Sequence, residues 1–425
     1  MRGGRVPVAR YRTAAVALAS LAVLGGPAVA PSVAAGPGAA AAPGIAAGPG
    51  IAAAGDCGRS APNVQAVPWS LQRMVLDELW QGGATTGAGV LVAVIDTGVD
   101  DQNPQLAHRV IDGGSLLKDK EGRRIEGGGK NDLVGHGTKV AGIIAAGRSE
   151  QTGFVGIAPG ATILSIRQND AEGNGDVHSL VEAIDSAVRQ GARVVNISQD
   201  VRGAGDSGFV GYAELKAAIE NAESRGAVVV ASSGNDGRKG DTYPAAFPTV
   251  LAVGASDRNN ERTYFSQYGD FVDVAAPGVD MLSTVPRGGQ CVDNGTSFAA
   301  PYVAGLAALL VGAHGDWRPS QVRAWIEQTA QRTDHKPNEY VGWGVVDPVK
   351  AVATAPVAPP DRATEDPPVR RAAAPIVPRP PGLGETRADR DGRTATYVLG
   401  VGALLVALVI GGAVVLRDHR RRPSD

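Results

Sequence analysis

The 425-residue sequence predicts an α/β domain, in which helices cover both faces of a parallel sheet, followed by one transmembrane helix. Two observations support this fold class. Apolar runs of strand length alternate with helical stretches across the middle of the chain, which is the order that right-handed β-α-β crossovers produce. Near the C-terminus, 22 consecutive residues carry no charge, which is enough to cross a bilayer core of about 30 Å.

Residues 1–35 have the pattern of a secretory signal peptide. Four arginines precede the apolar run 13–24, which is too short to span a membrane and is followed by small residues. Cleavage is expected near Ala30 or near Ala35, and Pro31 disfavours the first position. Residues 36–56 are rich in Ala, Gly and Pro and can bury almost no apolar surface, so we expect them to be disordered. An N-terminal extension, 57–87, follows.

The predicted domain spans residues 88–350. Its apolar runs predict strands at 92–98, 161–167, 193–198, 227–231 and 250–254. Helices are expected at 139–146, 179–190, 212–225, 296–313 and 319–329. Active sites of such sheets lie at the carboxyl ends of the strands.

The C-terminal end predicts membrane anchoring. Residues 351–394 contain a Pro-rich stretch without apolar periodicity, typical of a semi-extended linker. The uncharged segment 395–416 is the expected transmembrane helix, and the tail 417–425 follows it with arginines at positions 417, 420, 421 and 422. The positive-inside rule then places the tail in the cytoplasm and the domain on the extracytoplasmic side of the cell membrane.

Three side chains of complementary chemistry stand at the ends of predicted elements. Asp96 ends an apolar strand, His136 stands at the start of a helix, and Ser297 lies in the first turn of an apolar helix. A serine needs a base to take its proton and a group that orients the base. Each motif alone could be a turn or a helix cap. Because all three occur at the element ends that the mechanism needs, catalysis is the better interpretation.

The chain resembles the subtilase family of serine peptidases. The resemblance rests on Val-Ile-Asp-Thr-Gly around Asp96, Gly-His-Gly-Thr around His136 and Gly-Thr-Ser-Phe-Ala-Ala-Pro around Ser297. The order acid, base, nucleophile is that of subtilisin. A fourth match, Ala-Ser-Ser-Gly-Asn, aligns Asn235 with the family's side-chain donor to the oxyanion. The resemblance implies a subtilisin-like fold and a serine endopeptidase that acts on proteins or peptides.

The same resemblance implies where an extended substrate would bind. Ser198 and Gln199 match the segment that pairs with substrate beside the primary specificity pocket, and Gly173 and Gly175 would form the facing edge. Gln199 and Asp200 replace the small or apolar residues that broad-specificity subtilases often carry. A restricted substrate range is therefore expected.

The remaining composition predicts a disulfide and excludes several other functions. Cys57 and Cys291 are the only cysteines, and an exported chain is expected to join them in a bridge. The sequence lacks His-x-x-x-His, Cys-x-x-Cys and a dense carboxylate loop, so it offers no ligand set for a metal-based mechanism and no cofactor is expected. Structural calcium, which is common in subtilases, is not decided by the sequence. A formal charge of −2 gives no general attraction to nucleic acid.

The complete arrangement resembles the mycosins, membrane-anchored subtilases associated with type VII secretion. Signal peptide, N-terminal extension, Pro-rich linker and single C-terminal helix carry this resemblance. It implies two functions that can coexist. The chain would be a protease with a restricted substrate range, or mainly a structural component that stabilises the secretion membrane complex, with proteolysis dispensable.

Overall fold

The computed structural model describes residues 60–74, 76–81, 86–118, 123–125, 127–170, 175–202, 209–332, 334–355, 358–366 and 384–421. The chain divides after Asp366 into two units, of which the first holds the sheet and the second holds one long helix. The predicted signal peptide and the segment 36–56 lie outside the described residues.

Seven parallel strands form the central sheet, in the spatial order β2-β3-β1-β4-β6-β8-β9. All five expected strands are present in it, as β1 (Leu91–Asp96), β3 (Thr162–Arg167), β4 (Val194–Ile197), β6 (Val228–Ser232) and β8 (Val250–Ser256). The two edge strands, which the sequence analysis did not predict, are β2 (Val110–Ser115) and β9 (Val274–Pro277). Both are poor strand sequences, because β2 contains two glycines and β9 ends in proline.

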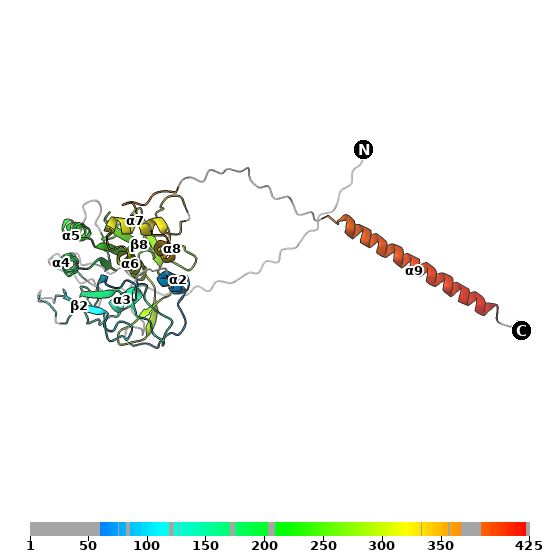
Figure 1. Cartoon of the computed structure of the whole chain (residues 1–425), viewed down its shortest axis with the longest axis horizontal. Helices are drawn as coiled ribbons and strands as arrows, with labels where there is room; N and C mark the ends of the chain where they lie inside the picture. The colour runs from blue at the N-terminus through cyan, green and yellow to red at the C-terminus, as the bar shows by residue number, and fades with distance from the viewer. Residues whose placement is uncertain are drawn as a thin grey trace, which may run out of the picture. The chain divides into compact units, whose positions relative to one another are not determined.

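Helices cover both faces of the sheet, as predicted. Strand β1 shows the division, because Val92 and Val94 belong to one buried cluster, whereas Ala93 and Ile95 belong to the other. The first cluster includes residues of α3 (His136–Ala145), α6 (Thr296–Ala313) and α7 (Pro319–Thr329), and the second includes residues of α4 (Val177–Arg189) and α5 (Tyr212–Ser224). Helices α4 and α5 lie side by side (Figure 1). The apolar helix α6 is long enough to span a membrane but is 89% buried, so it is a core helix.

The N-terminal extension packs on the domain through two short helices, α1 (Trp69–Gln72) and α2 (Leu76–Gln81). The indole of Trp69 donates to the carbonyl of Val279 at 2.9 Å, and that of Trp80 donates to the carbonyl of Ile157 at 3.1 Å. Each tryptophan therefore has a partly buried ring while its N–H keeps a partner.

Two small antiparallel hairpins complete the domain. One pairs β5 (Val201–Arg202) with β7 (Thr242–Tyr243), and the other pairs β10 (Met281–Thr284) with β11 (Gln290–Asp293). The second hairpin leads directly into α6 and thus bears on the position of Ser297.

Ordered structure continues past residue 351, where we predict the linker to begin. Helix α8 (Pro348–Ala353) crosses that boundary, and the segment 358–366 is bonded to α7. The amide N–H of Thr364 donates to Gln328 Oε1 at 2.8 Å, and Gln321 Nε2 donates to the carbonyl of Pro359 at 2.8 Å. Polar partners on the domain surface, which composition does not reveal, hold this Pro-containing segment in place.

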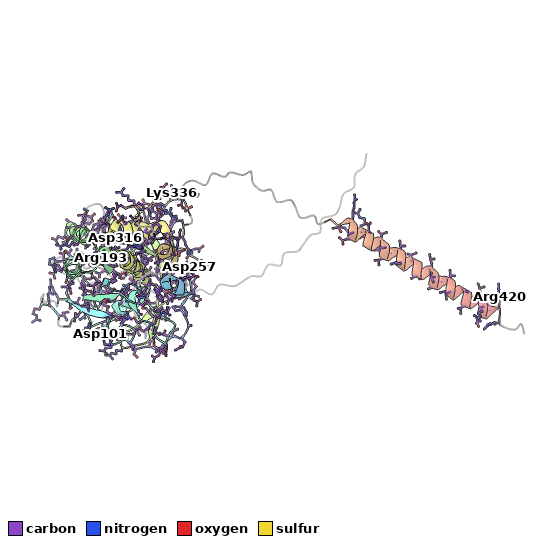
Figure 2. The ribbon with its side chains drawn as sticks, viewed as in Figure 1. Asp101, Arg193, Asp257, Asp316, Lys336 and Arg420 are labelled. Carbon is purple, nitrogen blue, oxygen red and sulfur yellow. The ribbon has the colours of Figure 1, made fainter. Side chains whose placement is uncertain are left out.

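The C-terminal helix, α9 (Arg387–His419), begins eight residues before the predicted transmembrane segment. Its start is determined by a capping box, in which Thr386 accepts from the N–H of Asp389 and the Asp389 carboxylate accepts from Thr386. None of its residues is buried, and its apolar residues face solvent from Tyr397 to Leu416. Arg420 lies at its C-terminal end (Figure 2). Length and composition make α9 a candidate membrane span.

Candidate active site

Three elements deliver the predicted catalytic residues to the carboxyl-end side of the sheet. Asp96 is the last residue of β1, His136 is the first residue of α3, and Ser297 is the second residue of α6. All three are buried, with 1%, 7% and 7% of their surface exposed.

Asp96 and His136 are joined directly. The Nδ1 atom of His136 lies 2.7 Å from Oδ1 of Asp96, and the same oxygen accepts from the backbone N–H of Thr97 at 2.7 Å. Because Nδ1 faces a carboxylate, that nitrogen carries the proton and Nε2 is left with the free lone pair. Nε2 is the nitrogen that can accept a proton from a nucleophile.

The electrostatic surroundings favour the protonated form of His136. Burial lowers the pKa of His136, but the charge and hydrogen bond of Asp96 outweigh it, with a smaller contribution from Asp293. The nearby charge of Lys139 opposes them, and the pKa of His136 is raised above its ordinary value. The imidazolium formed during catalysis is therefore stabilised where it forms.

The position of His136 depends on Asp132, which the sequence analysis missed. Oδ1 of Asp132 accepts from Thr97 Oγ1 and from the N–H groups of Val134 and Gly135, at 2.9, 3.0 and 2.7 Å. Oδ2 accepts from the N–H and the hydroxyl of Thr138 at 2.9 and 2.5 Å. One carboxylate thus joins the loop after β1 to the first turn of α3. An acid four residues before the helix-start histidine was the available signal.

Burial has a cost for that carboxylate. It raises the pKa of Asp132, although the hydrogen bonds from Thr138, Gly135 and Thr97 oppose the rise. The link that Asp132 makes between the loop after β1 and α3 therefore depends on these hydrogen-bond donors, since an unpartnered buried carboxylate would be unfavourable.

Close backbone contact brings α3 to Asp96. A Cβ atom on Gly137 would lie 2.0 Å from the carbonyl oxygen of Gly98 and 3.1 Å from the Cβ of Asp96. Only glycine fits at this position, because the nearest obstacle is backbone that cannot turn away. This explains the glycine that follows His136 in the motif.

Ser297 is anchored to the end of β4 by a pair of reciprocal hydrogen bonds. Proline at position 301 lacks the N–H that would bond the carbonyl of Ser297 within α6. The hydroxyl of Ser198 donates to that carbonyl instead, at 3.0 Å. In return, the hydroxyl of Ser297 donates to the carbonyl of Ser198 at 3.2 Å. The ring of the next residue, Phe298, packs against His136 with 5.3 Å between the ring centres.

Asn235 follows β6 and lies at the start of α6. Its Oδ1 accepts from the N–H of Thr296 at 2.9 Å and from the hydroxyl of Thr296 at 3.0 Å. These bonds set the orientation of the amide and direct Nδ2 away from the helix. Nδ2 has no hydrogen-bond partner among the described residues and is available as a donor beside Ser297.

A pocket of about 680 Å³ opens next to Asn235. Gly295 borders it at the start of α6, and its other walls include Thr263, Tyr264, Phe265, Asp236, Asp257 and Asp280. Its volume is that of a site for a side chain or a short peptide segment.

The predicted substrate-binding residues are only partly described. Ser198 and Gln199 are buried, and Gln199 Nε2 donates to Gln168 Oε1 at 2.6 Å. Gln168 also lies close to Gly175, because a Cβ atom added to Gly175 would lie only 2.3 Å from Gln168 Nε2. Gln168 therefore connects the two segments that we predicted to flank a substrate. Gly173 lies outside the described residues.

The structure describes one of the two cysteines. Cys291 lies in β11 and is not a free thiol, whereas Cys57 lies outside the described residues. Within the described part of the chain, no group of three or more His, Cys, Asp or Glu residues could hold a metal ion.

Comparisons with known proteins agree with this geometry. The subtilase family profile, Peptidase S8, matches residues 87–344. Subtilisin NAT of Bacillus subtilis subsp. natto is 37% identical over 293 residues, which are 68% of this chain and 72% of that protein. Subtilisin Savinase of Lederbergia lenta is 39% identical over 266 residues, 63% of this chain and 92% of that protein.

Solved structures of the same family include the mycosin MycP1, which this chain resembles. MycP1 from Mycobacterium smegmatis matches with a TM-score of 0.62 and 31% identity, over 75% of this chain and 93% of that one. A structure described as serine protease MycP1, an essential component of the type VII (ESX-1) secretion system, matches with a TM-score of 0.60 and 31% identity, over 69% and 92%. The chain therefore belongs to the subtilase family, is related to the mycosins within it, and is a serine endopeptidase.

Proposed function

We propose that the chain cleaves peptide bonds by acyl transfer, with Ser297 as nucleophile, His136 as general base and Asp96 as the residue that orients the base. The contact of 2.7 Å between His136 Nδ1 and Asp96 Oδ1 carries this proposal. It leaves Nε2 as the basic nitrogen, and the same imidazole packs against Phe298, the residue that follows Ser297.

The reaction starts with a rotation of the Ser297 side chain. Its hydroxyl leaves the carbonyl of Ser198 and donates to His136 Nε2. Catalytic hydrogen bonds often form with good geometry only when substrate is bound. As Oγ attacks the substrate carbonyl, His136 takes the proton and Asp96 stabilises the imidazolium. The imidazolium then protonates the leaving amine, and water releases the acyl group by the same steps in reverse.

Asn235 and the backbone N–H of Ser297 receive the oxyanion. The donor Nδ2 of Asn235 is held before substrate arrives, because Oδ1 is already bound to the start of α6. Preorganised donors of this kind need no rearrangement when charge develops, and each contributes about 3 kcal/mol to transition-state stabilisation. The positive end of α6 adds to the same effect.

The substrate is an extended protein or peptide segment, and its range is restricted. Gln199 and Asp200 are buried at the end of β4 instead of the small residues expected for an open apolar pocket. Main-chain pairing with residues 198–200 and with the edge containing Gly173 and Gly175 would supply affinity. Pockets for the substrate side chains would determine which sequences are cleaved.

The C-terminal helix anchors the protease in the cell membrane. The apolar face of α9 from Tyr397 to Leu416 is unburied, and Arg417 and His419 lie in its last turn. By the positive-inside rule the tail is cytoplasmic and the catalytic domain is extracytoplasmic. The relation to MycP1 and MycP3 leads us to place the chain at a type VII secretion membrane complex.

A bridge between Cys57 and Cys291 would attach the N-terminal extension to the hairpin before Ser297. The neighbouring backbone supports it, because the N–H groups of Ser60 and Ala61 donate to the carbonyls of Pro286 and Gly288, at 2.9 and 3.0 Å. Peptide mapping without reductant tests the bridge. Recovery of both cysteines as free thiols from the exported protein would contradict it.

Proteolysis is tested with the full chain in detergent micelles and a library of peptides. We expect cleavage by the unchanged protein and a loss of at least about 10⁴-fold in kcat/KM for Ser297→Ala and for His136→Ala. Cleavage that survives both substitutions would refute the assignment.

A structural role in the secretion complex is a second function, favoured by the membrane helix. Ser297→Ala separates it from catalysis in cells. Secretion that persists with Ser297→Ala but stops when the whole chain is removed would establish the structural role. Loss of secretion in both strains would make cleavage the required activity.

A further inference from the structure

The helix that carries His136 is attached to the hairpin that precedes Ser297. The hydroxyl of Thr284 in β10 donates to the carbonyl of Thr138 at 2.8 Å, and that of Ser283 donates to the carbonyl of Lys139 at 2.5 Å. A Cβ atom on Gly142 would lie only 2.1 Å from Thr284 Oγ1. Helix and strand therefore touch through backbone and hydroxyl groups, without a layer of side chains between them.

A largely buried ion pair joins α3 to β11, the second strand of the same hairpin. Nζ of Lys139 lies 2.8 Å from Oδ2 of Asp293, with 4% of the lysine side chain and 20% of the aspartate side chain exposed. Lysine is almost never fully buried without a partner. Breaking such a pair by removing one member is costly, because the other charge is left in the interior.

The pair occupies a particular place relative to the catalytic residues. Lys139 lies one turn after His136 on α3, and Asp293 ends β11 four residues before Ser297. The pair thus links the helix that begins with the base to the strand that leads to the nucleophile. Neither residue touches the reacting atoms directly, so any effect on catalysis acts through His136 or Ser297.

The charged groups that act on His136 come from three elements. Asp96 on β1 and Asp293 on β11 raise the pKa of the imidazole, whereas Lys139 on α3 lowers it. Helix α6 contributes the uncharged ring of Phe298. Because Lys139 and Asp293 oppose each other, removing either one alone leaves the other uncompensated near the base.

We propose that Lys139 and Asp293 are positioning residues, whose ion pair holds the histidine helix against the strand leading to the nucleophile and sets the pH range in which His136 acts as a base. This inference rests on the proposed role of His136. This role would account for the buried Lys139 directly after Gly-His-Gly-Thr in this chain.

The two charges predict opposite changes in the pH profile. The acid limb of kcat/KM reports the pKa of the free base. Lys139→Met removes the opposing positive charge, so the limb moves to higher pH. Asp293→Asn removes the supporting negative charge, so the limb moves to lower pH. Each shift is expected on the order of 0.5–1 pH unit for one nearby charge at low salt.

The experiment measures the rate of fluorophosphonate labelling of Ser297 between pH 4 and 10, using the full chain in detergent micelles. The double variant Lys139→Met, Asp293→Asn restores neutrality and is expected to return the midpoint to within about 0.3 pH unit of the starting value. It also keeps the test valid if Asp293→Asn alone fails to fold. In that case Lys139→Met and the double variant together decide the outcome.

A matched control distinguishes electrostatic tuning from general destabilisation. Arg323 on α7 and Glu223 on α5 form an ion pair of similar exposure, 2.7 Å long, and neither is among the groups that shift the pKa of His136. Arg323→Met should lower stability and leave the midpoint unchanged. Midpoints that do not move in opposite directions for the two single variants would overturn the inference. An unchanged chain that shows no labelling at Ser297 would instead overturn the proposed function.

Discussion

Two carboxyl groups with raised pKa values, on Glu327 and Asp273, predict how the stability of the domain depends on pH. Burial raises the pKa of Glu327 in α7 from 4.5 to about 7, with Arg323 and Arg332 opposing the rise. Burial, and secondly the charge of Glu327, also raises the pKa of Asp273 well above its ordinary value. Both carboxyl groups favour their protonated forms in the folded chain.

The sign and size of the effect follow from linkage. A carboxyl group whose pKa is raised by folding contributes stability that is present below pH 4.5 and is lost as pH rises through about 7. A rise from 4.5 to about 7 corresponds to about 3.4 kcal/mol at 1.36 kcal/mol for each pKa unit. Since Glu327 is only half-buried, solvent screening reduces this to about 2 kcal/mol.

Glu327→Gln removes the titration while keeping the shape of the side chain. We expect it to change the free energy of unfolding little at pH 5 and to increase it by about 2 kcal/mol at pH 8, relative to the same chain with Glu327. Denaturation would be followed by tryptophan fluorescence in detergent, with Ser297→Ala in both chains to prevent self-cleavage. Three of the five tryptophans lie in the domain and two lie in the N-terminal extension that packs on it, and none lies in α9.

The control for this prediction is Glu220→Gln, an exposed carboxylate on α5 that pairs with Lys216. It should alter stability equally little at both pH values. If Glu327→Gln changed the free energy of unfolding by the same amount at pH 5 and pH 8, the reasoning on burial would be refuted.

Two further predictions concern the geometry of the site. Asn235→Ala removes the oxyanion donor and should lower kcat by about 10²–10³-fold with little change in KM, measured by peptide hydrolysis; a fall of less than threefold would contradict the assignment. Gly137→Ala places a Cβ 2.0 Å from the carbonyl of Gly98, so α3 must move by about 1 Å and kcat should fall about 10²-fold. Unchanged kcat in a folded Gly137→Ala chain, judged by tryptophan fluorescence, would show that the close contact is unimportant.

The central part of the fold could be predicted from the sequence because its signals are local. Buried parallel strands such as β1 and β8 appear as unbroken apolar runs, and α6 appears as an apolar helix after a Gly-Thr-Ser motif. The edge strand β2 contains Gly113 and Gly114 and has exposed residues, so its composition indicates a loop. Its pairing with β3 depends on a neighbour that lies about 50 residues away in the sequence.

The site divides in the same way. Asp96, His136 and Ser297 each lie in a short sequence motif, and these motifs were sufficient to predict them. Lys139 and Asp293 lie 154 residues apart in the sequence, so only the folded structure reveals their contact. Asp132 bonds mainly to its own neighbours before and within the first turn of α3, and only its bond to Thr97 depends on the fold. The hydrogen bonds of segment 358–366 to side chains of α7 are likewise invisible in the composition, which indicates only a Pro-rich linker there.

The most direct test of the account is to map the fluorophosphonate adduct by mass spectrometry in the full chain at neutral pH. The account predicts a single adduct on Ser297, formed at least about 10³-fold more slowly when His136 is replaced by alanine. An adduct on another residue, or labelling of Ser297 at an equal rate without His136, would contradict the claim that the Asp96–His136 pair activates this serine.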